Sequence, residues 1–312
     1  MISCTEFIPA YSELFKYLHN LYGYEEVQKF WKYLFKPDGK GIPLINFLKK
    51  DGLKGAWDYW SGTLSEESAD VTRIMNLKEG WIKGIMHYCP SKGRLLQMKD
   101  ELGIEPYPHY CDHCDYYRAA LEECGFSWFY DFTEVDRASC TSVIYDPKVF
   151  KGVMTMDEDT VVLEYKSSQL EYFHPDFHSS MNMGIDYLGV NYGTEAVEEH
   201  LQIYTRNVYK KVIEDIKSRG LSAIADKIRE TYKLEKAEDK LTINETENTL
   251  EVSVSACPAV THLRKTGREV SKWFSYTTKT VMEELAKTAN CRFTMLSYDE
   301  ETGAAEYCFC KK

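Results

Sequence analysis

The sequence predicts an α+β protein built as a tandem duplication, in which each unit is a helical layer plus a small, mainly antiparallel sheet. Three observations lead to this class. Apolar residues recur at helical spacing early in each half, apolar and polar residues alternate later in each half, and the two halves match one another. At 312 residues the chain also exceeds what a single hydrophobic core usually serves.

The internal match is clearest between YLHNLYGYEEV, which begins at Tyr17, and YLGVNYGTEAV, which begins at Tyr187. A register that is shorter by two residues then persists, and it aligns identical residues: Gly52 with Gly220, Asp58 with Asp226, Cys89 with Cys257 and Cys140 with Cys308. We therefore expect a first repeat unit over residues 1–152, a connecting segment over 153–171 and a second repeat unit over 172–312.

The predicted elements follow the same order in both units. Helical patterns come first, at 8–21, 25–35 and 44–50 and at 185–192, 194–219 and 222–232. Strand-like alternation follows at 80–89 and in two arms within 241–258. A helix is then expected at 112–124 and 267–288, and a hairpin at 126–146 and 292–310, while the connecting segment adds a strand at 161–165.

Composition limits the functional classes. Hydrophobic residues make up 44% and aromatic residues 14%, enough for packed cores, and the net charge of −11 disfavours nucleic acid as a partner. Neither a secretory signal nor a membrane-spanning stretch is visible, so we expect a cytoplasmic protein whose ten cysteines are mostly reduced. No glycine loop implies a nucleotide cofactor, and the oligomeric state stays open.

The two copies differ in their polar clusters, and such differences are candidates for function. HYCDHCD, at 109–115, is present only in the first unit, because Lys279 and Met282 stand opposite Cys111 and Cys114. YFHPDFH, at 172–178, is present only in the second unit. Since ligand sites often lie between domains, we expect the two clusters to meet at a cleft between the repeats.

The first cluster allows several interpretations. A helix start stabilises a thiolate and can make a cysteine reactive at neutral pH, so Cys111 is a candidate nucleophile with His109 or His113 as its base. Alternatively, Cys111 and Cys114, one turn apart, bind zinc together with Cys89 or an imidazole. A redox pair is a weaker option, and a capped helix start with a buried cysteine is the structural alternative.

Two further groups are candidates for substrate binding. Pro175 suits the first turn of a helix, which places His174 and His178 on one face, where they could bind a metal or orient a carboxylate substrate. A capping role for His174 is the alternative. Trp57 and Trp60 also occur in one copy only, and they either line a pocket for a small planar molecule or belong to the core.

The run from Cys89 to Asp146 resembles the C-terminal part of the L-2-amino-thiazoline-4-carboxylic acid hydrolase-like family. The shared pattern is a strand that ends in Cys-Pro, a second cysteine before a helix with an acidic residue after it, and a third cysteine on a closing strand. Here these are Cys89, Cys111 (with Cys114 and Asp115 as a variant) and Cys140.

This resemblance implies a hydrolase that acts on a C–N bond of a small cyclic amidine or amide. Cys111 would attack, or a bound zinc ion would activate water, with acids and bases drawn from His109, His113, His174 and His178. The alternative is a non-catalytic small-molecule-binding or sensory protein related to 4-vinyl-reductase-type domains, with structural zinc. A scaffold that docks a partner protein through its acidic surface is a third possibility.

Overall fold

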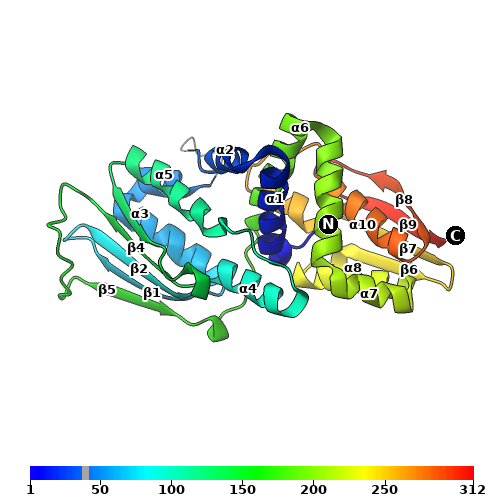
Figure 1. Cartoon of the computed structure of the whole chain (residues 1–312), viewed down its shortest axis with the longest axis horizontal. Helices are drawn as coiled ribbons and strands as arrows, with labels where there is room; N and C mark the ends of the chain where they lie inside the picture. Colours follow the sequence, from blue (N-terminus) through cyan, green and yellow to red (C-terminus); the bar gives the residue numbers. More distant parts are fainter. Residues whose placement is uncertain (37–41) are drawn as a thin grey trace. The chain divides into compact units, whose positions relative to one another are not determined.

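The computed structural model describes residues 1–36 and 42–312, which fall into two units (Figure 1). Residues 18–174 form one, here the continuous unit; residues 1–17 and 175–312 form the other, here the split unit. The boundary falls within α1 (Phe7–Tyr22). These bounds differ from the expected ones in two respects. Residues 1–17 group with the second half of the chain, and the connecting segment 153–171 belongs to the continuous unit.

The continuous unit contains a five-stranded antiparallel sheet of order β3-β4-β2-β1-β5. Its strands are β1 (Asp70–Asn76), β2 (Trp81–Tyr88), β3 (Ser127–Asp131), β4 (Cys140–Tyr145) and β5 (Val161–Tyr165). Its helices are α2 (Tyr24–Leu34), α3 (Leu44–Glu66), α4 (Pro90–Leu102) and α5 (Arg118–Glu123). A core cluster joins α3 and α5 to the sheet through residues such as Leu48, Leu121 and Ile144, because these elements bury their apolar faces together.

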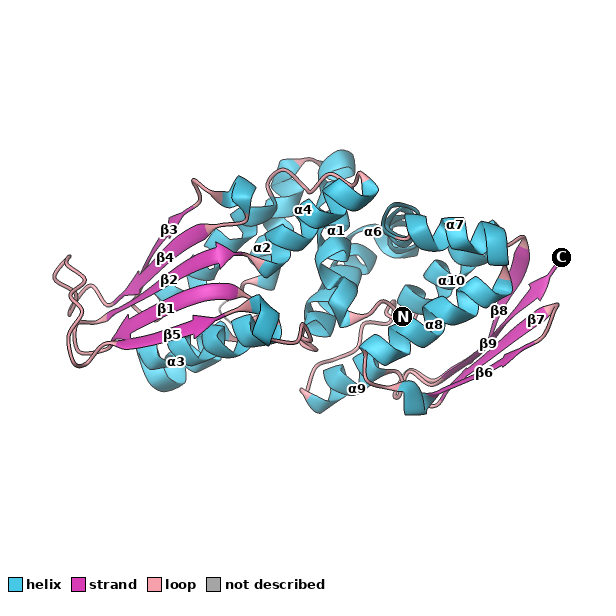
Figure 2. Ribbon diagram, turned by 90° about the horizontal axis from the view of Figure 1, so that it is seen from below, coloured by secondary structure: helices cyan, strands magenta, loops and turns pink. Residues whose placement is uncertain are grey.

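The split unit contains a four-stranded antiparallel sheet of order β6-β7-β9-β8 (Figure 2). Its strands are β6 (Leu241–Glu245), β7 (Thr249–Val254), β8 (Cys291–Tyr298) and β9 (Ala305–Lys311). Its helices are α6 (Phe177–Val208), α7 (Lys210–Arg219), α8 (Leu221–Leu234), α9 (Pro258–Lys265) and α10 (Tyr276–Thr288). In β7 the burial alternates, so Leu250, Val252 and Val254 face the core.

The α+β class is confirmed. Strands β1, β2, β3 and β4 are ordered 1-2-4-3 in their sheet, and β6 to β9 are ordered 6-7-9-8 in theirs, so the two arrangements correspond. Gly52 and Gly220, which the sequence aligns, also share a backbone conformation that glycine adopts readily, with φ and ψ of 58° and −133° and of 63° and −126°. These likenesses agree with a duplication, which stays a prediction.

Several elements differ from the expectation. The segment 112–124 forms a 3₁₀ helix (Tyr110–Tyr117) followed by the short α5. Helix α10 begins only at Tyr276, rather than at residue 267, because Gly267 adopts a positive φ of 72° at the end of α9. Helices α4 and α9 were not expected, although each begins with a proline directly after a cysteine N-cap, Cys89 or Cys257.

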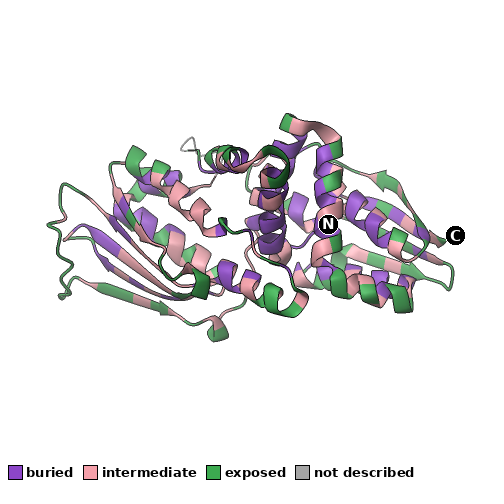
Figure 3. Ribbon diagram, viewed as in Figure 1, coloured by how far each residue is buried: buried purple, intermediate pink, exposed green. Residues whose placement is uncertain are grey.

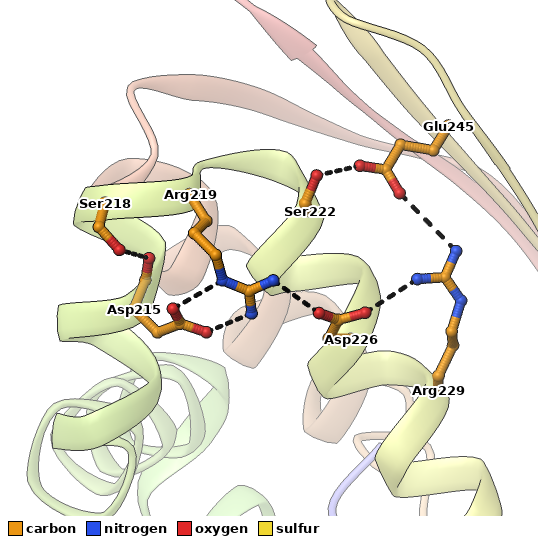
Figure 4. Close-up of polar contacts among 7 residues, drawn as sticks. All are labelled: Asp215, Ser218, Arg219, Ser222, Asp226, Arg229 and Glu245. Carbon is orange, nitrogen blue, oxygen red and sulfur yellow. Dashed lines mark hydrogen bonds and ion pairs between the residues drawn. The ribbon is translucent and has the colours of Figure 1, made fainter.

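Surface features of each unit are plain in Figures 3 and 4. The loop between β4 and β5 is exposed throughout residues 151–159 (Figure 3). In the split unit, Arg219 bridges Asp215 and Asp226 across the junction of α7 and α8, and Arg229 extends this ion-pair network to Glu245 of β6 (Figure 4). Among the described residues, no helix is both long and apolar enough to cross a membrane.

Candidate functional site

A cavity of about 150 Å³ lies within the continuous unit, and all of its walls come from that unit. The walls carry an unusual number of thiols, namely Cys89, Cys111, Cys114 and Cys140. Aromatic rings cover much of the remaining surface, from Trp60, Tyr110, Tyr117, Trp128 and Tyr130. The cavity therefore unites the three cysteines of the family-like pattern with Cys114.

Local structure explains why four thiols reach one cavity. Residues i and i+3 of a 3₁₀ helix share a face, so Cys111 and Cys114 both lie on the cavity side of the helix Tyr110–Tyr117. Cys89 is the N-cap of α4, and its Sγ atom accepts a hydrogen bond from the Lys92 N–H at 3.5 Å. Cys140 opens β4, where its Sγ atom lies 3.2 Å from the Tyr130 hydroxyl.

These thiols are protonated at neutral pH. Burial raises the pKa of Cys111 to about 11, although the nearby Lys92 charge acts in the opposite direction. Burial also raises the pKa of Cys89 and of Cys114 well above the ordinary thiol value. Desolvation, rather than proximity to a helix start, thus determines the charge state of Cys111 in this structure.

One imidazole contacts one of these thiols. The Nδ1 atom of His113 lies within hydrogen-bond distance of the Tyr110 carbonyl oxygen, and a carbonyl only accepts, so Nδ1 carries the proton. The Nε2 atom is then the acceptor, and it lies 3.7 Å from the Cys114 Sγ atom. Burial lowers the pKa of His113 to about 4, which keeps the ring neutral. His113 therefore pairs with Cys114 rather than with Cys111.

Two cations face the same cavity. Arg73 is only 3% exposed, on the core face of β1, and its Nη1 atom donates to the Trp57 carbonyl oxygen and to the Ser61 hydroxyl. Lys92 is 7% exposed. Within the described part of the chain, no carboxylate oxygen lies within 4 Å of either cationic group. Burial raises the pKa of Glu67, an acid that also lines the cavity, and so favours its neutral form.

Of the other predicted residues, His109, Asp115 and Trp57 lie outside the cavity lining. His109 is exposed and packs on the ring of Tyr24, with its Nδ1 atom 3.1 Å from Asp112 Oδ2. Asp115 forms an ion pair of 2.6 Å with Arg118. Trp57 belongs to the core beneath Arg73, whereas Trp60 lines the cavity and stacks on Trp128 with 5.3 Å between ring centroids.

His174 and His178 do not share a helix face. Helix α6 begins at Phe177, so His174 precedes it; there its Nδ1 atom binds the Glu66 carboxylate, within the continuous unit. His178 is buried in the split unit, where its Nε2 atom lies 3.0 Å from Glu235 Oε2. The two histidines therefore take part in separate sites.

A different group could hold a metal ion. Among the described residues, the set of three His, Cys, Asp or Glu side chains whose donor atoms all lie within 4.8 Å of one another is Cys4, His178 and Glu235. Sequence reasoning missed Cys4 and Glu235 because 231 residues separate them. Sequence reasoning also missed Arg73, although the sequence contains a sign of it. Arg73 is a lone arginine on the apolar face of a strand, between Val71 and Met75.

No family model, no curated protein and no solved structure matches this chain. The likeness of the segment from Cys89 to Asp146 to the thiazoline-carboxylate hydrolase-like family therefore stays a resemblance.

Proposed function

We propose that the continuous unit binds a small planar molecule that carries an acidic group, in the cavity beside Arg73. Arg73 is the observation that carries this proposal. A guanidinium has five N–H donors, and among the described residues the hydrogen bonds of Arg73 come from Nη1. Keeping a cation in a desolvated site costs free energy unless an opposite charge or hydrogen bonds compensate it. An anionic ligand supplies that compensation.

The size and walls of the cavity support a planar ligand. A cavity of about 150 Å³ matches the space that accommodates one benzene-sized molecule. Trp60 contacts both Tyr117 and Trp128 there, each with 5.3 Å between ring centroids, and such aromatic side chains stack on flat rings. The protonated thiols add polarizable surface and weak donors. A five- or six-membered ring with a carboxylate fits this set of groups.

The test is calorimetric titration of the full chain with two acids, benzoate and 2-amino-2-thiazoline-4-carboxylate, each beside its neutral carboxamide. We expect both acids to bind more tightly than their amides. Loss of a hydrogen bond to a charged group is worth about 1.5–3 kcal/mol, so Arg73→Met should weaken acid binding roughly 10–100-fold and amide binding much less.

Arg137→Met is the matched control, since Arg137 is exposed and pairs with Glu134 away from the cavity. It should bind as the wild type does. Equal binding of acid and amide by the wild type, or equal effects of the two arginine substitutions, would refute the proposal.

The contact between His113 and Cys114 favours a second function, hydrolysis of a C–N bond in the same ligand class. Because burial keeps the Cys114 thiol protonated, this scheme has no free thiolate: His113 Nε2 takes the thiol proton as the sulfur attacks the amidine carbon, and passes it to the ring nitrogen as the C–N bond breaks. Water then adds to the same carbon, His113 Nε2 takes a proton from it, and the C–S bond to Cys114 breaks with that proton returned to the thiol. Cys114→Ser should abolish turnover of 2-amino-2-thiazoline-4-carboxylate, whereas Cys111→Ser should retain it. Undiminished turnover in Cys114→Ser would exclude the scheme.

Zinc remains the candidate ion for this protein. Among the described residues, the donor set close enough together to share one ion is Cys4, His178 and Glu235 of the split unit, rather than Cys89, Cys111 and Cys114.

A further inference from the structure

Cys4, His178 and Glu235 meet in the interior of the split unit from three distant parts of the chain. Cys4 opens a 3₁₀ helix (Cys4–Glu6), His178 lies in the first turn of α6, and Glu235 directly follows α8. Their exposed fractions are 0%, 1% and 6%, so all three are enclosed by protein. Their donor atoms all lie within 4.8 Å of one another.

The backbone holds this arrangement independently of any ion. The Cys4 N–H donates to Glu235 Oε1 at 2.6 Å, which fixes the carboxylate against the chain segment at Cys4. The side chain of Ser3 caps the 3₁₀ helix through a capping box, and this sets the direction in which Cys4 enters the interior. A donor set positioned in this way needs little rearrangement to bind an ion.

Two features of the group point to a ligand. The Nδ1 atom of His178 is buried and has no hydrogen-bond partner among the described residues. Buried polar atoms are almost always satisfied, so such an atom calls for an explanation. The second feature is the Glu235 carboxylate, whose two oxygens are held in the interior by the Cys4 N–H at 2.6 Å and by His178 Nε2 at 3.0 Å.

We propose that Cys4, His178 and Glu235 bind one zinc ion in the interior of the split unit. A thiolate, an imidazole and a carboxylate are the three ligand types that zinc accepts, and together they form an intermediate donor set that calcium and magnesium do not prefer. Three protein ligands leave one tetrahedral position for a water molecule. The enclosed position assigns the ion a structural role, in which it ties the segment at Cys4 to α6 and to the end of α8.

An ion pair between a protonated His178 and Glu235 is the alternative that requires no metal. It pairs the carboxylate with His178 Nε2 at 3.0 Å and does not use the Cys4 thiol as a ligand. The two alternatives differ in what happens when Cys4 loses its sulfur, because only the metal site needs a thiolate there.

Cobalt(II) is the probe that separates them. The full chain is stripped with a chelator, titrated with Co²⁺ and followed by the thiolate-to-cobalt charge-transfer absorption, and zinc bound per chain is then measured by elemental mass spectrometry. The wild type should bind about one ion tightly, with that absorption. Cys4→Ser should lose the absorption and weaken binding by more than the roughly 10–100-fold that loss of an outer-shell partner costs.

Cys291→Ser is the matched control, because Cys291 is likewise buried in the split unit and its Sγ atom donates to the Ala289 carbonyl oxygen. It should behave as the wild type does. Glu235→Gln, close in size and shape, should also weaken binding. Added zinc should raise the unfolding temperature of the wild type and of Cys291→Ser, but not that of Cys4→Ser. A wild type without the thiolate absorption, or an unchanged absorption in Cys4→Ser, would overturn the site.

Discussion

The Nη1 atom of Arg73 donates a hydrogen bond to the carbonyl oxygen of Trp57 at 2.6 Å. The same oxygen also accepts from the Ser61 hydroxyl at 2.7 Å, so it stays satisfied when the guanidinium is removed. Burial lowers the pKa of Arg73 to about 10, which shows that the site disfavours the charge. The Cζ atom of Arg73 also lies 4.5 Å from the centroid of the Trp57 ring, a cation–π contact that offsets part of the cost of burying the charge.

Arg73→Met should leave the fold as stable as the wild type or more so. Replacing buried charged groups with apolar side chains of similar volume is often neutral or stabilising by about 1–4 kcal/mol. Urea unfolding of both proteins, without ligand, measures this difference. A loss of several kcal/mol would mean that Arg73 serves the fold, and it would remove the main reason to assign it to a ligand.

The Cys111 thiol should react slowly in the folded protein. With its pKa raised to about 11, its thiolate fraction at pH 7 lies far below that of an ordinary cysteine. Iodoacetamide should therefore alkylate Cys111 about 100-fold or more slowly in the native chain than in the chain unfolded in urea. Peptide mass spectrometry over time gives both rates. Similar rates would restore Cys111 as a candidate nucleophile.

Acid should destabilise the split unit through His200. Burial lowers the pKa of this histidine to about 3, and its Nδ1 atom has no hydrogen-bond partner among the described residues. The unfolded chain binds a proton near pH 6.5 and the folded chain does not, so stability is full above that pH and falls as the pH drops toward 3. Each tenfold difference in proton affinity is worth about 1.4 kcal/mol, which amounts to a few kcal/mol over this range.

His200→Leu should flatten the pH dependence of the free energy of unfolding between those limits. His87→Gln, a change at an exposed histidine of the continuous unit, should leave it as in the wild type. If His200→Leu and the wild type lose stability in parallel on acidification, His200 is not the responsible group.

Gly220 should resist substitution for reasons of backbone alone. A Cβ atom there would meet no atom within 4 Å, but φ is positive at 63°. Gly220→Ala should therefore cost about 1–3 kcal/mol. Gly62, inside α3 and also without neighbours for a Cβ, is the control, since Gly62→Ala should stabilise by about 0.5–1 kcal/mol. Because neither site is crowded, the difference in thermal unfolding between the two variants measures the cost of the backbone conformation at Gly220.

Local patterns predicted much of the fold. The strand at 161–165 and the two arms within 241–258 correspond to β5, β6 and β7, because alternation of apolar residues reports a half-buried strand directly. The helix from residue 112 was the weaker prediction. Helical composition does not distinguish an α-helix from the 3₁₀ turns that place Cys111 and Cys114 on one side.

The candidate site was less accessible to sequence reasoning. The comparison of the two halves selected Cys111, Cys114 and His113, and these residues line one cavity with Cys89. It also grouped His174 with His178, although the chain separates them at the start of α6. Contacts such as that of Cys4 with Glu235 depend on how distant segments pack, and no local spacing encodes them.

The most direct test of the account is a crystal structure of the full chain with 2-amino-2-thiazoline-4-carboxylate. We predict that the ligand ring lies among Trp60, Tyr117 and Trp128, and that its carboxylate accepts hydrogen bonds from the Arg73 guanidinium. A ligand bound elsewhere on the chain, or one in the cavity with its carboxylate directed away from Arg73, would contradict the proposed function.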